Sequence, residues 1–158
     1  MMAVALAYAP AACGGDEPSG VAVGGAHVTT SWELVDDGAQ LHVVITPDAP
    51  AFHLYSTDLV PADHRGLGVA TELAVEGGWR STAGPRATVE VVDVVIDALG
   101  VRLPAFPNGP VEFVLPVKPE SDAPVELVVT FGLCSASTCL KPARDVHIAV
   151  ESPPLPAP

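Results

Sequence analysis

Prolines and glycines are spread along almost the whole chain, and this spacing is the feature that most restricts its fold. The 158 residues include 17 prolines and 14 glycines. A proline inside a helix costs about 3 kcal/mol, because it removes a hydrogen bond and clashes with the preceding turn. Long helices are therefore excluded, and with them a helical bundle or a coiled coil. Short strands joined by turns are predicted instead.

The stretches between these turns have the length and the pattern of strands. They are either continuously apolar or alternate between apolar and polar residues. The predicted strands span 29–34, 39–46, 52–55, 69–75, 87–96, 111–117, 125–131 and 146–150. Acidic residues interrupt the alternation in 87–96, which predicts a bulge or a bend there. About eight strands without a helical period indicate an all-β fold, an immunoglobulin-like antiparallel β-sandwich.

Composition excludes several classes of protein. The net charge is −12, whereas a nucleic-acid binder needs basic residues to neutralise phosphates. No nucleic-acid partner is therefore expected. The apolar fraction of 49 % is too high for a disordered chain. Three cysteines are too few for a small domain held together by disulfides.

The two ends of the chain differ from its body. Small apolar residues lead to Cys13, and a Gly-Gly-Asp-Glu-Pro-Ser-Gly stretch follows it. This order is similar to the end of a bacterial lipoprotein signal peptide, with Cys13 as the lipid attachment site. The first Lys or Arg of the chain is Arg65, and Pro10 stands where leucine is usual, so a disordered apolar start is the alternative. The leader is too short to span a bilayer, which needs about 20 apolar residues.

These features divide the chain into three parts. Residues 1–27 are predicted to be a leader and a flexible tether, 28–150 a β-sandwich domain, and 151–158 a disordered proline-rich tail. The leader predicts an extracytoplasmic location, in the periplasm or at the cell surface. A lipid on Cys13 would anchor the domain to a membrane.

Cys134 and Cys139 flank four small residues between two predicted strands. In a hairpin with such a loop the flanking residues face each other, at about the 5.5–6 Å between Cα atoms that a disulfide prefers. A bridge across so short a loop stabilises a fold by only ~2 kcal/mol, and exposed bridges are often the labile ones. A redox role and a structural role both remain open. A zinc site is less favoured, because the five histidines show no paired spacing with these cysteines.

Three segments together resemble a known family. They are Phe-His-Leu-Tyr-Ser at 52–56, the apolar run Gly-Pro-Val-Glu-Phe-Val-Leu-Pro-Val at 109–117, and 125–142, which ends in Cys-x4-Cys-Leu-x-Pro. In this order they resemble the periplasmic N-terminal domain of the DsbD-type thiol:disulfide interchange proteins, over about residues 28–150.

The resemblance implies an immunoglobulin-like fold and a redox-active pair formed by Cys134 and Cys139. Such a pair accepts electrons from a membrane donor of the DsbD or CcdA type and passes them to thioredoxin-like periplasmic proteins. This is a protein-disulfide reductase activity that needs no cofactor. The resemblance also implies that Cys139 forms the mixed disulfide. It places Tyr55, His53 and Phe131 beside the cysteines, where they shield the sulfur atoms. The alternatives are an aromatic residue at the rim of the core for Tyr55 and an exposed strand residue for His53.

The family also sets expectations for parts that do not match. Its full-length members continue into a membrane domain and a thioredoxin-like domain, so electrons would reach this chain from a separate protein. The nearest counterpart of the family's cap over the cysteines is 97–100. One competing interpretation is a binding module whose disulfide only braces a loop. A copper-handling protein that uses the cysteines with His53 or His64 is another, although no Met-rich or His-rich tract supports it.

Overall fold

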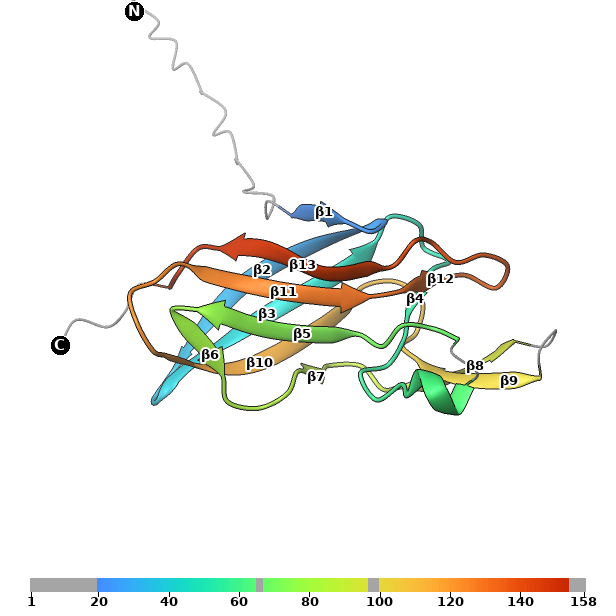
Figure 1. Cartoon of the computed structure of the whole chain (residues 1–158), viewed down its shortest axis with the longest axis horizontal. Coiled ribbons are helices and arrows are strands. Elements are labelled where there is room, and N and C mark those ends of the chain that lie inside the picture. Colours follow the sequence, from blue (N-terminus) through green and yellow to red (C-terminus); the bar gives the residue numbers. More distant parts are fainter. Residues whose placement is uncertain (1–19, 65–66, 97–99, 154–158) are drawn as a thin grey trace, which may run out of the picture.

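The computed structural model describes residues 20–64, 67–96 and 100–153 (Figure 1). Apart from a single-turn 3-10 helix, its regular elements are strands, which confirms the all-β prediction. In chain order the elements are β1 (Val21–Val23), β2 (Ala26–Val35), β3 (Gly38–Pro47), β4 (His53–Leu54), η1 (Pro61–His64), β5 (Glu72–Gly77), β6 (Trp79–Ser81), β7 (Arg86–Ala87), β8 (Val92–Ile96), β9 (Val101–Ala105), β10 (Val111–Pro119), β11 (Val125–Phe131), β12 (Leu133–Cys134) and β13 (Ala143–Val150). No helix among these residues is long and apolar enough to cross a membrane.

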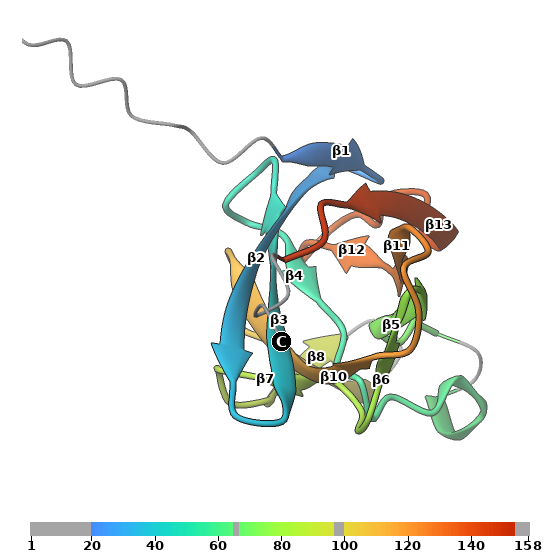
Figure 2. The same cartoon turned by 90° about the vertical axis from the view of Figure 1, so that its left-hand side faces the viewer.

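Two antiparallel sheets face each other and form the sandwich (Figure 2). The larger has the order β1-β2-β3-β10-β6, with β7 also paired to β10, and the smaller has the order β13-β11-β5. Strand β3 shows why the sheets pack: every second residue is buried along its whole length. Its inward residues are Ala39, Leu41, Val43 and Ile45, so the strand contributes a continuous apolar face.

The core divides into a large and a small cluster of buried side chains. The large one fills the space between the two sheets and includes Phe106 and Phe113, whose rings meet edge to face with centroids 5.4 Å apart. The small cluster contains Tyr55, Leu59, Ala70, Leu103, Ala105 and Cys134. A buried cysteine therefore belongs to a separate, minor core.

Two further pairs of strands lie together at one end of the sandwich (Figure 1). One pair is β12 with β4, and the other is β8 with β9. This end carries both the cysteine hairpin and the β8–β9 hairpin, and it is where the candidate site lies.

The longest predicted strand, 87–96, is in fact two strands. Its start, β7, pairs with β10 in the large sheet, whereas its end, β8, pairs with β9. The chain bends at residues 88–89, as predicted, and passes from the large sheet to the separate two-stranded sheet of β8 and β9. The interrupted alternation therefore marks a bend at which the chain changes its partner strand. The sheet also starts earlier than the predicted domain boundary at residue 28, since β1 pairs with β2.

Candidate functional site: a hairpin disulfide beside a groove

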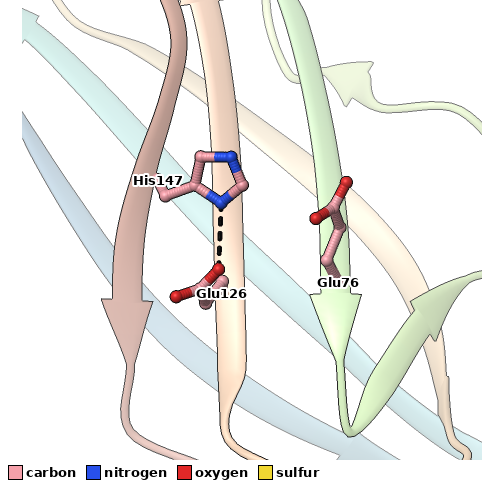
Figure 3. Close-up of side chains that lie close together, drawn as sticks. All are labelled: Glu76, Glu126 and His147. Atoms are coloured by element: carbon pink, nitrogen blue, oxygen red, sulfur yellow. Dashed lines mark hydrogen bonds and ion pairs between the residues drawn. The ribbon is translucent and has the colours of Figure 1, made fainter.

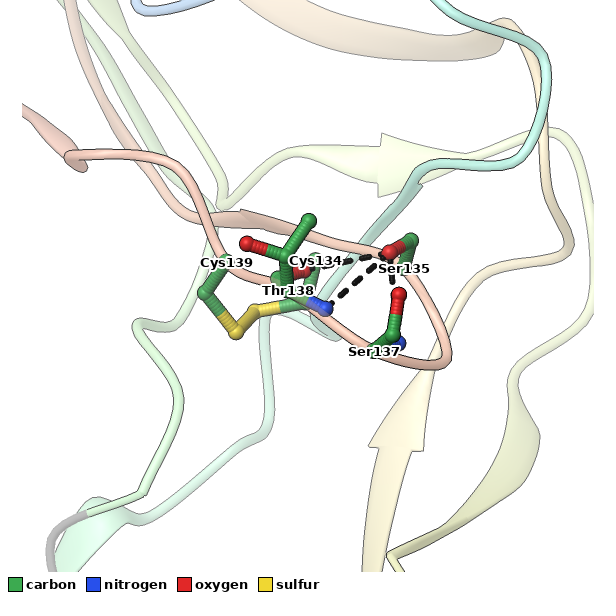
Figure 4. Close-up of a disulfide and its surroundings, with 5 residues drawn as sticks. All are labelled: Cys134, Ser135, Ser137, Thr138 and Cys139. Carbon is green, nitrogen blue, oxygen red and sulfur yellow. Dashed lines mark hydrogen bonds between the residues drawn. A yellow bond between two sulfur atoms is a disulfide. The ribbon is translucent and has the colours of Figure 1, made fainter.

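The hairpin that follows β12 brings Cys134 and Cys139 face to face in a disulfide (Figure 4). The backbone N–H of Ser135 donates to the Thr138 carbonyl at 2.7 Å, and that of Leu140 donates to the Leu133 carbonyl at 2.9 Å. These bonds bracket the cysteines, which makes them a non-hydrogen-bonded antiparallel pair. Such pairs approach more closely than hydrogen-bonded ones. The Cα atoms are accordingly 4.0 Å apart, shorter than the 5.5–6 Å expected from the sequence.

The loop has hydrogen bonds of its own. The Ser135 Oγ accepts from the backbone N–H of Ser137 at 3.3 Å and from that of Thr138 at 3.2 Å (Figure 4). Short-range bonds of this kind from serine stabilise a tight turn. We therefore expect the hairpin to keep its shape when the disulfide is reduced.

The two cysteines differ in their exposure. Cys134 is 6 % exposed and packs in the small core cluster, whereas Cys139 is exposed. A sulfur atom of another protein therefore reaches Cys139 more readily than Cys134.

Strand β4 places two aromatic side chains next to Cys134. His53 is its direct partner in the pairing of β4 with β12, and directly opposed residues project from the same face of a sheet. Tyr55 follows two residues later, and its ring meets the His53 ring at right angles with centroids 5.5 Å apart. Both side chains are buried. The structure thus brings together Cys134, Cys139, His53 and Tyr55.

A groove with a volume of about 480 Å³ runs past the disulfide. The described residues that line it include no Asp, Glu, Lys or Arg. They are His53, Tyr55, Leu67, Val94, Val95, Ile96 and the hairpin 134–139. Strand β8 contributes three apolar side chains to its wall, Val94, Val95 and Ile96. The proposed counterpart of the family's cap, 97–100, joins β8 to β9, but 97–99 lie outside the described residues.

Burial keeps both aromatic groups neutral near pH 7. It lowers the pKa of His53, and a side-chain interaction with Asn108 opposes this to a smaller extent. Burial also raises the pKa of the Tyr55 phenol. The His53 Nε2 atom is buried and has no hydrogen-bond partner in the described part of the chain. A neutral imidazole and a neutral phenol can each exchange a hydrogen bond with a sulfur atom.

Other residues singled out from the sequence lie elsewhere. Phe131 is completely buried in the large core cluster and does not line the groove. His64 ends η1, an element separate from the cysteine hairpin. Cys13 lies outside the described residues.

A second group of titratable side chains lies on the exposed face of the smaller sheet (Figure 3). Glu76 and Glu126 face each other on β5 and β11, and His147 Nδ1 lies 2.9 Å from Glu126 Oε2. The carboxylate raises the pKa of His147. The three residues are far apart in the sequence, and only the pairing of three strands reveals the group. A protonated His147 offsets the repulsion between the two carboxylates.

The chain was compared with known proteins. No family model matches it, and no curated protein matches it. Its structure is similar to the solved N-terminal domain of Neisseria meningitidis DsbD in the reduced form. The likeness covers 79 % of this chain and 85 % of that chain, with a TM-score of 0.46 and 14 % sequence identity.

Proposed function

We propose that this protein exchanges disulfides with other thiol proteins through Cys134 and Cys139. The observation that carries the proposal is the position of the bridge, which joins a buried to an exposed cysteine beside a groove whose described lining residues carry no Asp, Glu, Lys or Arg. A bridge that mainly stabilises a fold joins distant segments, but this one spans a sequence separation of 5. Accessible bridges of this kind are typically reactive.

The exchange runs through two bond transfers. In the reduced protein the Cys139 thiolate attacks one sulfur of a disulfide in the partner protein. A Cys139–partner disulfide forms, the partner's own bond breaks, and its second sulfur leaves as a thiolate. The Cys134 thiolate then attacks Cys139 Sγ and re-forms the intramolecular bridge. The partner is released reduced by two electrons, and a donor dithiol restores the protein by the reverse steps.

The cellular setting in this proposal comes from the sequence resemblance. Electrons would arrive from a membrane donor of the DsbD or CcdA type and leave to thioredoxin-like proteins of the periplasm. The domain would work outside the cytoplasm, with a lipid on Cys13 as its membrane anchor. The neutral rings of Tyr55 and His53 would shield the Cys134 sulfur between exchanges.

Two matched variants test the proposal. Cys134→Ser leaves the exposed Cys139 alone, and Cys139→Ser leaves the buried Cys134 alone. The partner is a thioredoxin-like protein that retains one active-site cysteine, activated as its thionitrobenzoate disulfide. The first variant is expected to displace thionitrobenzoate and accumulate a stable mixed disulfide, because neither protein has a second thiol to resolve it. The second is expected to form it at least tenfold more slowly. Equal rates would refute the assignment of Cys139 as the attacking residue, and no mixed disulfide in either variant would refute the exchange function.

A binding module with a bracing disulfide is the second candidate. It is favoured by the large apolar side chain of Val95, which lines the groove and remains exposed. Such a module would bind its ligand equally well with the bridge intact or reduced. Isothermal titration in both redox states separates the two functions, because an exchange protein binds its partner differently in each.

A further inference from the structure

The His53 side chain carries a polar atom that the fold leaves unused. The residue is 4 % exposed, and Nε2 has no hydrogen-bond partner among the described residues. Buried polar atoms without a partner are uncommon, because losing water without a replacement bond costs free energy. Leucine or phenylalanine would fill the same place without that cost. A buried histidine at this position therefore needs a chemical reason.

We propose that His53 takes up the proton of the Cys134 thiol when the bridge forms and supplies a proton to the Cys134 sulfur when the bridge is opened again. The inference rests on the exchange function proposed above. In this account the two thiols lose their protons to different acceptors. Water receives the proton of the exposed Cys139, and His53 receives that of Cys134.

The location of Cys134 makes an internal proton acceptor necessary. Its side chain is buried in the small core cluster. Burial in apolar surroundings raises the pKa of a thiol and so suppresses the nucleophilic thiolate. His53 is the direct cross-strand partner of Cys134, so the two side chains share one face. The Tyr55 ring, set edge-on at 5.5 Å, supports the imidazole from the side.

The proton transfer completes the resolving step. The Cys134 S–H gives its proton to His53 Nε2, which leaves a thiolate beside an imidazolium. The thiolate attacks Cys139 Sγ in the mixed disulfide, the Cys134–Cys139 bond forms, and the partner sulfur leaves with the electron pair. The imidazolium then gives its proton to that departing thiolate or to water. In the reverse direction the imidazolium protonates Cys134 as it leaves.

Few other groups around His53 titrate near neutral pH. Apart from the cysteines, Tyr55 is the other titratable side chain that lines the described groove, and burial keeps it protonated. Asn108 is uncharged. Burial lowers the pKa of His53, so the neutral form that accepts a proton predominates near pH 7. Asp97 and Arg65 adjoin groove segments in the sequence but lie outside the described residues, so the experiment includes variants of both.

The test separates the two thiol reactions with Ellman's reagent. The reduced protein releases one thionitrobenzoate when Cys139 attacks the reagent and a second when Cys134 resolves the mixed disulfide. His53→Phe keeps an aromatic wall and His53→Gln keeps a polar one, but neither accepts a proton. Both variants are expected to slow the second release about tenfold or more at pH 7, and to leave the first unchanged. The exposed His27 provides the matched control, His27→Gln.

The pH profile gives the second measurement. In wild type, the rate of the second release should rise through the titration of His53, and this inflection should vanish in His53→Phe. It should persist in Asp97→Asn and Arg65→Gln. A second release at the wild-type rate with the same profile in both His53 variants would overturn the role of His53 alone. Absence of the second release from wild type would overturn the exchange function itself.

A measurement on the wild-type protein tests the inference even if the His53 variants fail to fold. NMR titration of the His53 ring should give a higher pKa in the reduced protein, where it faces a thiolate, than in the oxidised one. Identical titration in both redox states would also overturn the inference.

Discussion

Breaking the Cys134–Cys139 bond is expected to cost only about 2 kcal/mol of folding stability. The bridge closes a loop with a sequence separation of 5. In the loop-entropy description, a closed loop of about six residues restricts the unfolded chain by roughly 7 cal/mol/K, or about 2 kcal/mol at 25 °C. The native state should lose little more, because the large core cluster contains no cysteine and the turn keeps its serine hydrogen bonds.

Urea unfolding of the oxidised and the reduced protein measures this cost. With a slope of about 1.5 kcal/mol/M, the midpoint should fall by roughly 1.3 M on reduction while the slope stays nearly unchanged. The double variant Cys134→Ala/Cys139→Ala should behave like the reduced protein. As a reference, Leu127→Ala in the large core should cost about 2–5 kcal/mol.

A larger effect would refute this reasoning. A loss above about 4 kcal/mol would exceed what so short a loop can supply. If the reduced protein no longer unfolded in a single cooperative transition, that would also refute this reasoning. Either result would show that the bridge holds the native structure together, as the bracing function requires.

Two other predictions concern the scaffold. His42 lies between Glu112 and Glu33, and the hydrogen bond to Glu112 is the main cause that raises its pKa. Its stabilising effect is present below about pH 6.5 and disappears as pH rises through the higher folded pKa. The advantage of wild type over His42→Gln in urea should therefore shrink as the pH rises above about 6.5. Gly77 has a φ of +87°, and a Cβ there would clash with a backbone carbonyl. Gly77→Ala should therefore lower the unfolding free energy by more than about 2 kcal/mol, and Gly84→Ala, which meets open space, by less than about 0.5.

The sequence predicts those strands whose burial alternates along a single sheet. Strand β3 is the clearest case, because Leu41, Val43 and Ile45 alternate with partly exposed residues. The run 87–96 shows the limit, since an apolar stretch does not reveal that its two halves pair with different sheets. Short strands such as β6 and β12 are equally hidden. They have too few residues to show an alternating pattern, and they form a strand only because a neighbouring strand pairs with them.

The candidate site, like the fold, is only partly predictable from the sequence. The pairing of Cys134 with Cys139 is predictable because both lie on one hairpin. The contact of His53 with Cys134 depends on β4 pairing with β12, which no local pattern reveals. Phe131 shows how nearness in sequence misleads: it precedes Cys134 by three residues, and an odd separation along extended chain points side chains to opposite faces. Phe131 therefore enters the large core and Cys134 the small one.

The most direct test of thiol-disulfide exchange is the reduction potential of the Cys134–Cys139 pair. It can be measured by equilibrating the protein in glutathione buffers and counting alkylated thiols by mass spectrometry. The exchange function predicts a potential within the range of known oxidoreductases, roughly −120 to −270 mV. A potential below about −300 mV would contradict it and identify the bridge as an inert structural disulfide.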